Sequence, residues 1–195
     1  SRVSLDDFLD ELCDGLAEGR LEVDHVDFIG PDLPPVDEES LGFSLVSKGL
    51  ARGGLFETDG TLSLPSDAFH KRGIVVERGS FQEVEPLHAA MLTNATQMFD
   101  SHHTDVDRES IALFEITTRN VRTNETLPTS ELQRRVQNLR KLGRPILVTN
   151  IGAFLHLSDY LRRFTREPIG FVVGVDTLMW LFNPSFYSGL RGGLL

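Results

Sequence analysis

The fold is decided by the stretch Gly73-Ile-Val-Val-Glu-Arg-Gly-Ser-Phe-Gln-Glu-Val-Glu-Pro-Leu-His88. Its β-branched run at 74–76 is typical of a strand, and Pro86 opens a segment with apolar residues at helical spacing. Between the two lies a turn that contains Gly79. A strand, a glycine turn and a helix start present backbone N–H groups to an anion beyond the carboxyl end of the strand. The stretch therefore predicts the phosphate-binding corner of a Rossmann-like domain.

The chain from residue 73 onward alternates strands with helices. Apolar runs predict strands at 74–76, 111–116, 146–149 and 171–174. Helical spacing predicts helices near 86–99, 129–142, 153–164 and 176–182. Continuous apolar strands separated by helices indicate a parallel sheet that is covered on both faces. The predicted fold class is therefore α/β, a Rossmann-like parallel sheet with helices on both faces.

The N-terminal part predicts a small α+β appendage of unknown role over residues 1–70, ahead of the Rossmann-like domain at 71–195. Its pattern indicates a helix from Ser4 to about Gly19, a strand at 21–29 and a hairpin at 53–64 that turns at Asp59-Gly60. The segment 41–50 fits a short helix or a strand, and 65–72 reads as a linker.

Composition excludes several classes of protein. The 195 residues are 40% apolar with 13 Phe, which is enough for a sizeable core. The net charge of −10 argues against nucleic acid or an anionic membrane as a partner. A single cysteine, Cys13, excludes an internal disulfide and a multi-cysteine zinc site. No signal peptide or membrane-spanning stretch is visible, so we expect a cytoplasmic protein; the start at Ser1 suggests a processed chain or a fragment.

Two motifs resemble a known family. Gly79-Ser-Phe-Gln-Glu-Val-Glu-Pro-Leu-His88 resembles the N-terminal signature of the nucleotidylyltransferase superfamily, Gly-Ser-Phe-Asn-Pro followed by His-x-Gly-His. This superfamily includes nicotinate mononucleotide adenylyltransferases and cytidylyltransferase-like proteins. Phe171-Val-Val-Gly-Val-Asp176-Thr-Leu is similar to its later strand-end motif, Gly-x-Asp-x-Leu. The resemblance covers about residues 73–190 in the same order.

The resemblance implies a reaction and a set of residues. The reaction is transfer of AMP or CMP from an NTP, with Mg²⁺, to a phosphorylated small molecule such as a pyridine mononucleotide. It implies His88 as the catalytic residue and no metal ligand from the protein. The residues that it implies for nucleotide and phosphate binding are Gly79, Ser80, Phe81, Gly174 and Asp176.

The chain departs from the family pattern at catalytic positions. An ungapped alignment places Glu85 at the first histidine and Leu87 at the glycine, and the family's distal basic motif is absent before Leu195. A carboxylate would repel a triphosphate, and a side chain replaces the glycine that lets the backbone approach the ligand. Loss of activity is therefore expected. The alternatives are a catalytically inactive nucleotide-binding or interaction module, or a fragment of a bifunctional enzyme.

Each candidate residue also has a structural interpretation. His88 has the spacing of a half-buried helix residue, Asp176 that of a helix N-cap, and Glu83 and Glu85 fit a solvated loop. Seven basic residues are expected to lie on solvated helix faces: Arg134, Arg135, Arg140, Lys141, Arg162, Arg163 and Arg166. A polar loop, rather than a metal site, is expected for His102, His103, Asp105 and Asp107.

Overall fold

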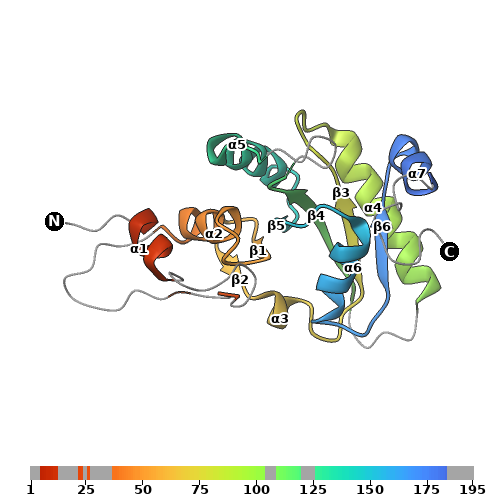
Figure 1. Cartoon of the computed structure of the whole chain (residues 1–195). Coiled ribbons are helices and arrows are strands. Elements are labelled where there is room, and N and C mark those ends of the chain that lie inside the picture. Colours follow the sequence, from red (N-terminus) through yellow and green to blue (C-terminus); the bar gives the residue numbers. More distant parts are fainter. Residues whose placement is uncertain are drawn as a thin grey trace.

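The sheet has six strands in the order β2-β1-β5-β4-β3-β6 (Figure 1). The structure is a computed structural model, and it describes residues 5–12, 22–23, 26, 37–103, 109–119 and 126–183. The strands are β1 (Gly53–Phe56), β2 (Leu62–Ser63), β3 (Ile74–Arg78), β4 (Ile111–Thr117), β5 (Ile146–Thr149) and β6 (Ile169–Val172).

The strands β3 to β6 run parallel, as the sequence predicts. Ile74 is paired with Ile111 of β4 on one side and with Ile169 of β6 on the other. The chain therefore passes from β3 to β4 and β5 in one direction and then crosses to the far side of β3. This crossing creates a topological switch point between β3 and β6, where open α/β sheets bind their ligands. The predicted Rossmann-like α/β fold is confirmed.

The strand β6 begins and ends two residues earlier than predicted. The hydrogen-bond ladder between β3 and β6 extends back to Pro168, because Ile74 N donates to Pro168 O at 3.1 Å. At the other end, Leu178 N donates to Gly174 O at 2.9 Å, so the chain has turned into a helix where the sequence predicts the last strand residue. Helix hydrogen bonding at Gly174 thus ends the strand.

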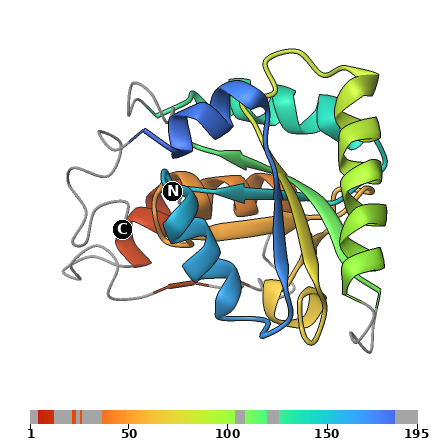
Figure 2. The same ribbon diagram turned by 90° about the vertical axis from the view of Figure 1, so that its right-hand side faces the viewer.

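Helices cover both faces of the sheet (Figures 1 and 2). They are α1 (Leu5–Leu12), α2 (Glu38–Ser47), α3 (Pro65–Ala68), α4 (Pro86–His102), α5 (Thr129–Arg140), α6 (Phe154–Arg162) and α7 (Val175–Leu181). One core lies beneath α2, α4 and α5 and includes Leu45, Leu92 and Val136. The other lies beneath α6 and includes Leu157 and Leu161. Among the described helices, none has both the length and the apolar content that a membrane crossing requires.

The N-terminal elements extend the same sheet. The strand β1 pairs antiparallel with β5, with Gly53 opposite Thr149, and β2 completes the predicted hairpin. Its turn is at Asp59-Gly60, where Gly60 has a φ of +96° and Thr61 N donates to Asp59 Oδ1 at 3.0 Å. The ambiguous segment 41–50 lies largely in α2, and the predicted linker contains α3. Most of the predicted strand at 21–29 lies outside the described residues.

Candidate functional site

The carboxyl edge of the parallel strands brings the two predicted motifs together. Glu77 of β3 is paired with Val172 of β6, so the chain leaves the sheet at neighbouring points after these strands. The loop at 79–85, here called the β3 corner, leads to α4, and the residues 173–174, the β6 corner, lead to α7. Segments that are distant in the sequence therefore meet at the switch point.

Gly79 and Phe81 of the β3 corner are held by packing and by the sheet. Gly79 N donates to Glu115 O at 3.2 Å, so this N–H belongs to the sheet. A Cβ at position 79 would lie 2.9 Å from the ring of Phe81, which is buried and packs edge-on against Phe114 at 5.5 Å. Phe81 also has a φ of +44°, a strained value for a residue with a side chain. The glycine is thus required by the aromatic ring above it.

His88 closes the first turn of α4. Its Nδ1 accepts the backbone N–H of Glu85 at 3.1 Å, and its ring lies edge-on to Phe81 at 5.2 Å. His88 is half-buried in the helix, as its spacing in the sequence predicts. With Nδ1 engaged in this way, the ring nitrogen left for a ligand is Nε2.

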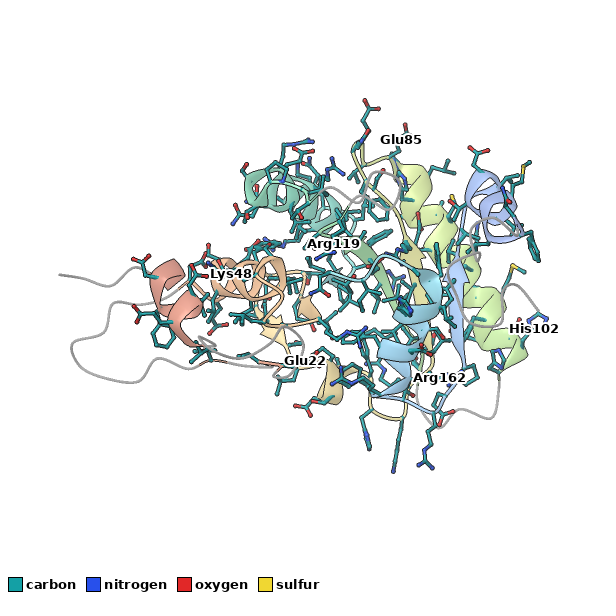
Figure 3. The ribbon with its side chains drawn as sticks, viewed as in Figure 1. Glu22, Lys48, Glu85, His102, Arg119 and Arg162 are labelled. Atoms are coloured by element: carbon teal, nitrogen blue, oxygen red, sulfur yellow. The ribbon has the colours of Figure 1, made fainter. Side chains whose placement is uncertain are left out.

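The start of α4 offers an anion fewer donors than the sequence suggests. Pro86 has no backbone N–H, and the N–H of His88 donates to Glu85 O at 3.1 Å. Glu83 and Glu85 are both exposed, as expected of a solvated loop, and Figure 3 shows Glu85 at the outer rim of the molecule. Carboxylates at this position oppose the binding of a phosphate.

The β6 corner is open among the described residues. A Cβ at Gly174 would meet none of their atoms within 4 Å, and Val175 is 74% exposed. Asp176 is exposed in the first turn of α7, and this helix begins at Val175. The interpretation of Asp176 as the N-cap is therefore wrong, because the helical hydrogen bonds begin at Gly174.

A buried ionic network that the sequence analysis missed joins the ends of three neighbouring strands. Arg78 Nε of β3 lies 3.0 Å from Glu115 Oε2 of β4, and their side chains are 4% and 0% exposed. Thr149 Oγ1 of β5 donates to Glu115 Oε1 at 2.6 Å, and Arg78 Nη2 donates to Ile151 O. Burial raises the pKa of Glu115, while the guanidinium and the hydroxyl oppose this rise.

A second buried carboxylate lies on the opposite face of β3. Glu77 alternates with Arg78 along the strand, so its side chain points toward α4 rather than α6. Its Oε2 has no hydrogen-bond partner among the described residues. Burial raises the pKa of Glu77 to about 7. The sequence signal for Glu77 was a charged residue directly after the apolar run 74–76, and for Glu115 it was a charged residue inside the apolar run 111–116.

The expectation of solvated arginines on α5 is wrong for Arg135. This side chain is buried, and its Nη1 donates to Ser80 O at 2.8 Å while its Nε donates to Glu131 Oε1 at 2.7 Å. Arg135 thereby ties α5 to the β3 corner. Arg140 is also partly buried, because it pairs with Glu39 of α2 at 2.9 Å.

The predicted polar stretch after α4 is described only in part. Asp105 and Asp107 lie outside the described residues. His102 Nδ1 lies 2.7 Å from Met98 O, and the ring of His103 packs at a tilt of 55° against Phe99, with the ring centroids 4.7 Å apart. Figure 3 shows His102 at the end of α4 far from Glu85. The described residues contain no group of three or more His, Cys, Asp or Glu side chains suited to a metal ion.

Comparisons of the chain with protein-family models, with curated protein sequences and with solved structures find no match.

Proposed function

We propose that this chain is a nucleotidylyltransferase-like module that binds a nucleotide or another phosphorylated small molecule at the switch point and does not transfer a nucleotidyl group. The pairing of β3 with β6 carries the proposal, because it places residues 79–81 and 174–176 at one edge. Gly174 supports it further, since no atom of the described residues lies within 4 Å of its Cβ position. A crevice at this edge is where open parallel sheets place their ligands.

The geometry around α4 is the reason to propose binding without transfer. His88 Nδ1 is engaged by Glu85 N at 3.1 Å, and this holds the ring against its own helix. Glu85 and Leu87 occupy the positions of the first histidine and the glycine in the family signature, and both are exposed. Transfer depends on positive charge placed at the leaving phosphates. A carboxylate at that place raises the barrier instead.

Under this proposal, Mg²⁺ would bind only together with the nucleotide. Such an ion is usually held by one or two carboxylates together with the phosphates of the substrate and several waters. Asp176 is the exposed carboxylate at the β6 corner that suits this role. An active enzyme would use Mg²⁺ with the NTP, whereas a binding module for a monophosphate needs none.

The proposal is tested by finding which residues the nucleotide contacts. Backbone amide NMR spectra recorded during titration with AMP, ATP and CTP should show shifts at residues 79–81 and 174–176, and adenosine, which lacks a phosphate, should cause weaker shifts. Shifts confined to the opposite edge of the sheet would contradict the proposal. Incubation of ATP or CTP with nicotinamide mononucleotide and Mg²⁺ should release no pyrophosphate. Release that is lost in His88→Ala would show an active transferase.

A further inference from the structure

The start of α6 is an open helix N-terminus at the carboxyl edge. Its N-cap, Ala153, has an extended backbone with no side-chain capping bond, and Leu155 in the first turn is 53% exposed. A Cβ at Gly152 would meet no atom of the described residues within 4 Å. The first N–H groups of a helix have no partner within the helix and carry its positive end. Within the described part of the chain, no side chain caps this end of α6, and its first donors are left without a partner.

Arg78 supplies a second and independent observation at the same place. The guanidinium is buried, its Nη2 donates to Ile151 O in the loop before α6, and its Cζ lies 5.0 Å from the ring of Phe154, the first residue of α6. Its Nη1 has no hydrogen-bond partner among the described residues. A buried donor without a partner is costly and rare, and it calls for an explanation.

We propose that the first turn of α6 and Arg78 together form the subsite for the phosphate group of the ligand. This inference rests on the proposed function and locates the phosphate on the α6 side of the edge rather than at α4. A phosphate oxygen would accept from the first-turn N–H groups, and another would accept from Arg78 Nη1. The start of α4 is less suited, because Pro86 lacks an N–H and Gly79 N is bonded to Glu115 O at 3.2 Å.

Two neighbours limit the affinity of this subsite. The Glu115 carboxylate lies 3.0 Å from Arg78 Nε and offsets its charge, although Thr149 Oγ1 donates to that carboxylate at 2.6 Å. The ring of Phe154 lies across the guanidinium, so it must turn aside before a phosphate reaches Nη1. Phosphate binding should consequently be weak in the natural chain and stronger in Phe154→Ala.

The test uses inorganic phosphate as the probe, and amide NMR follows its binding to variants that add a carboxylate either at Gly152 or far from the subsite. Gly152→Asp places a carboxylate at the start of α6 and should weaken phosphate binding at least tenfold. Gly152→Asn has the same size without the charge and should bind within about threefold of the natural chain. Gln97→Glu adds the same charge at an exposed position of α4 far from the edge and should have less than a threefold effect. The space around Gly152 among the described residues and the exposure of Gln97 let each variant fold.

Several results would overturn the subsite. These are no phosphate binding by the natural chain, equal losses in Gly152→Asp and Gln97→Glu, or no gain in Phe154→Ala. The proposed function fails separately. If AMP shifts residues 79–81 and 174–176 while Gly152→Asp changes nothing, the subsite is wrong and the module stands. If phosphate binding depends on Gly152 but no nucleotide binds, the subsite stands and the nucleotide proposal fails.

Discussion

The two faces of the sheet differ at its carboxyl edge. On the α6 face, Arg78, Glu115 and Thr149 form a connected ionic network beside an open glycine, Gly152. On the α4 face, the ring of Phe81 fills the corner, and Glu77 is buried without a partner for its Oε2 in the described part of the chain. One face thus joins its buried charges in a network across three strands, whereas on the other face Arg135 bonds to Ser80 O and Glu77 Oε2 has no such partner among the described residues.

The difference shows how one strand can serve two purposes. Glu77 and Arg78 are consecutive in β3, and the alternation of side chains sends them to opposite faces. A buried charge costs several kcal/mol unless a partner and hydrogen bonds compensate for it. Arg78 and Glu115 compensate for each other, while Glu77 responds by holding its proton. The two faces should therefore respond differently to mutation and to pH.

The largest expected effect is the loss of Arg78. Arg78→Met leaves the Glu115 carboxylate buried and unpaired, and it should lower the free energy of unfolding by about 3–5 kcal/mol. Adding Glu115→Gln in the same chain should recover most of that loss, because no buried charge then remains. Urea denaturation of the single and double variants measures both effects.

Arg134→Met is the matched control for this experiment. Arg134 pairs with Glu131 at 2.7 Å, but its side chain is 52% exposed. An exposed pair contributes about 0–1 kcal/mol, so this variant should stay close to the natural stability. If Arg78→Met and Arg134→Met lower the free energy of unfolding by the same amount, the network on the α6 face does not hold the three strand ends together.

The next largest effect is the pH dependence of the free energy of unfolding that arises from Glu77. Its pKa is about 7 in the folded chain, against an ordinary value of 4.5. Below pH 4.5 the Glu77 carboxyl is protonated in both the folded and the unfolded state. Between pH 4.5 and 7 the folded state keeps this proton, whereas the unfolded state has lost it. Stability therefore falls as pH rises through this window, by about 3 kcal/mol in total, and levels off above it.

Glu77→Gln should remove this component. The variant should match the natural chain near pH 4.5 and exceed its free energy of unfolding by about 3 kcal/mol at pH 8. Denaturant titrations across this range give the difference between the two profiles. Glu83→Gln changes an exposed carboxylate of the next loop and should leave the profile unchanged. Parallel profiles for the natural chain and Glu77→Gln would refute an isolated, protonated Glu77.

The fold was predictable from the sequence because its signals are local. Continuous apolar runs gave the four parallel strands, and helical spacing gave α4 to α7 within a few residues. The pairing of Arg78 with Glu115 was not predictable from spacing, since it depends on the register between β3 and β4. The hydrogen bond from Arg135 to Ser80 depends in the same way on the placement of α5 over the β3 corner. A motif alignment assigns residue types to positions, but it does not show which donors are already bonded.

The smallest expected effect asks whether the α4 face can be made to hold a phosphate. Glu85→His with Leu87→Gly restores the family signature, and both side chains are exposed, so the change should not disturb the core. Weak nucleotide binding is expected of the natural chain. Removing the carboxylate restores the attraction of the helix start, about 0.3–1 kcal/mol, so affinity should rise about two- to fivefold. Titration calorimetry with ATP and CTP measures this, and Leu87→Gly alone separates bulk from charge. Tight binding by the natural chain would show that the charge argument is wrong. An unchanged affinity in the double variant would show that the motif is misaligned and that the phosphate belongs to the α6 face alone.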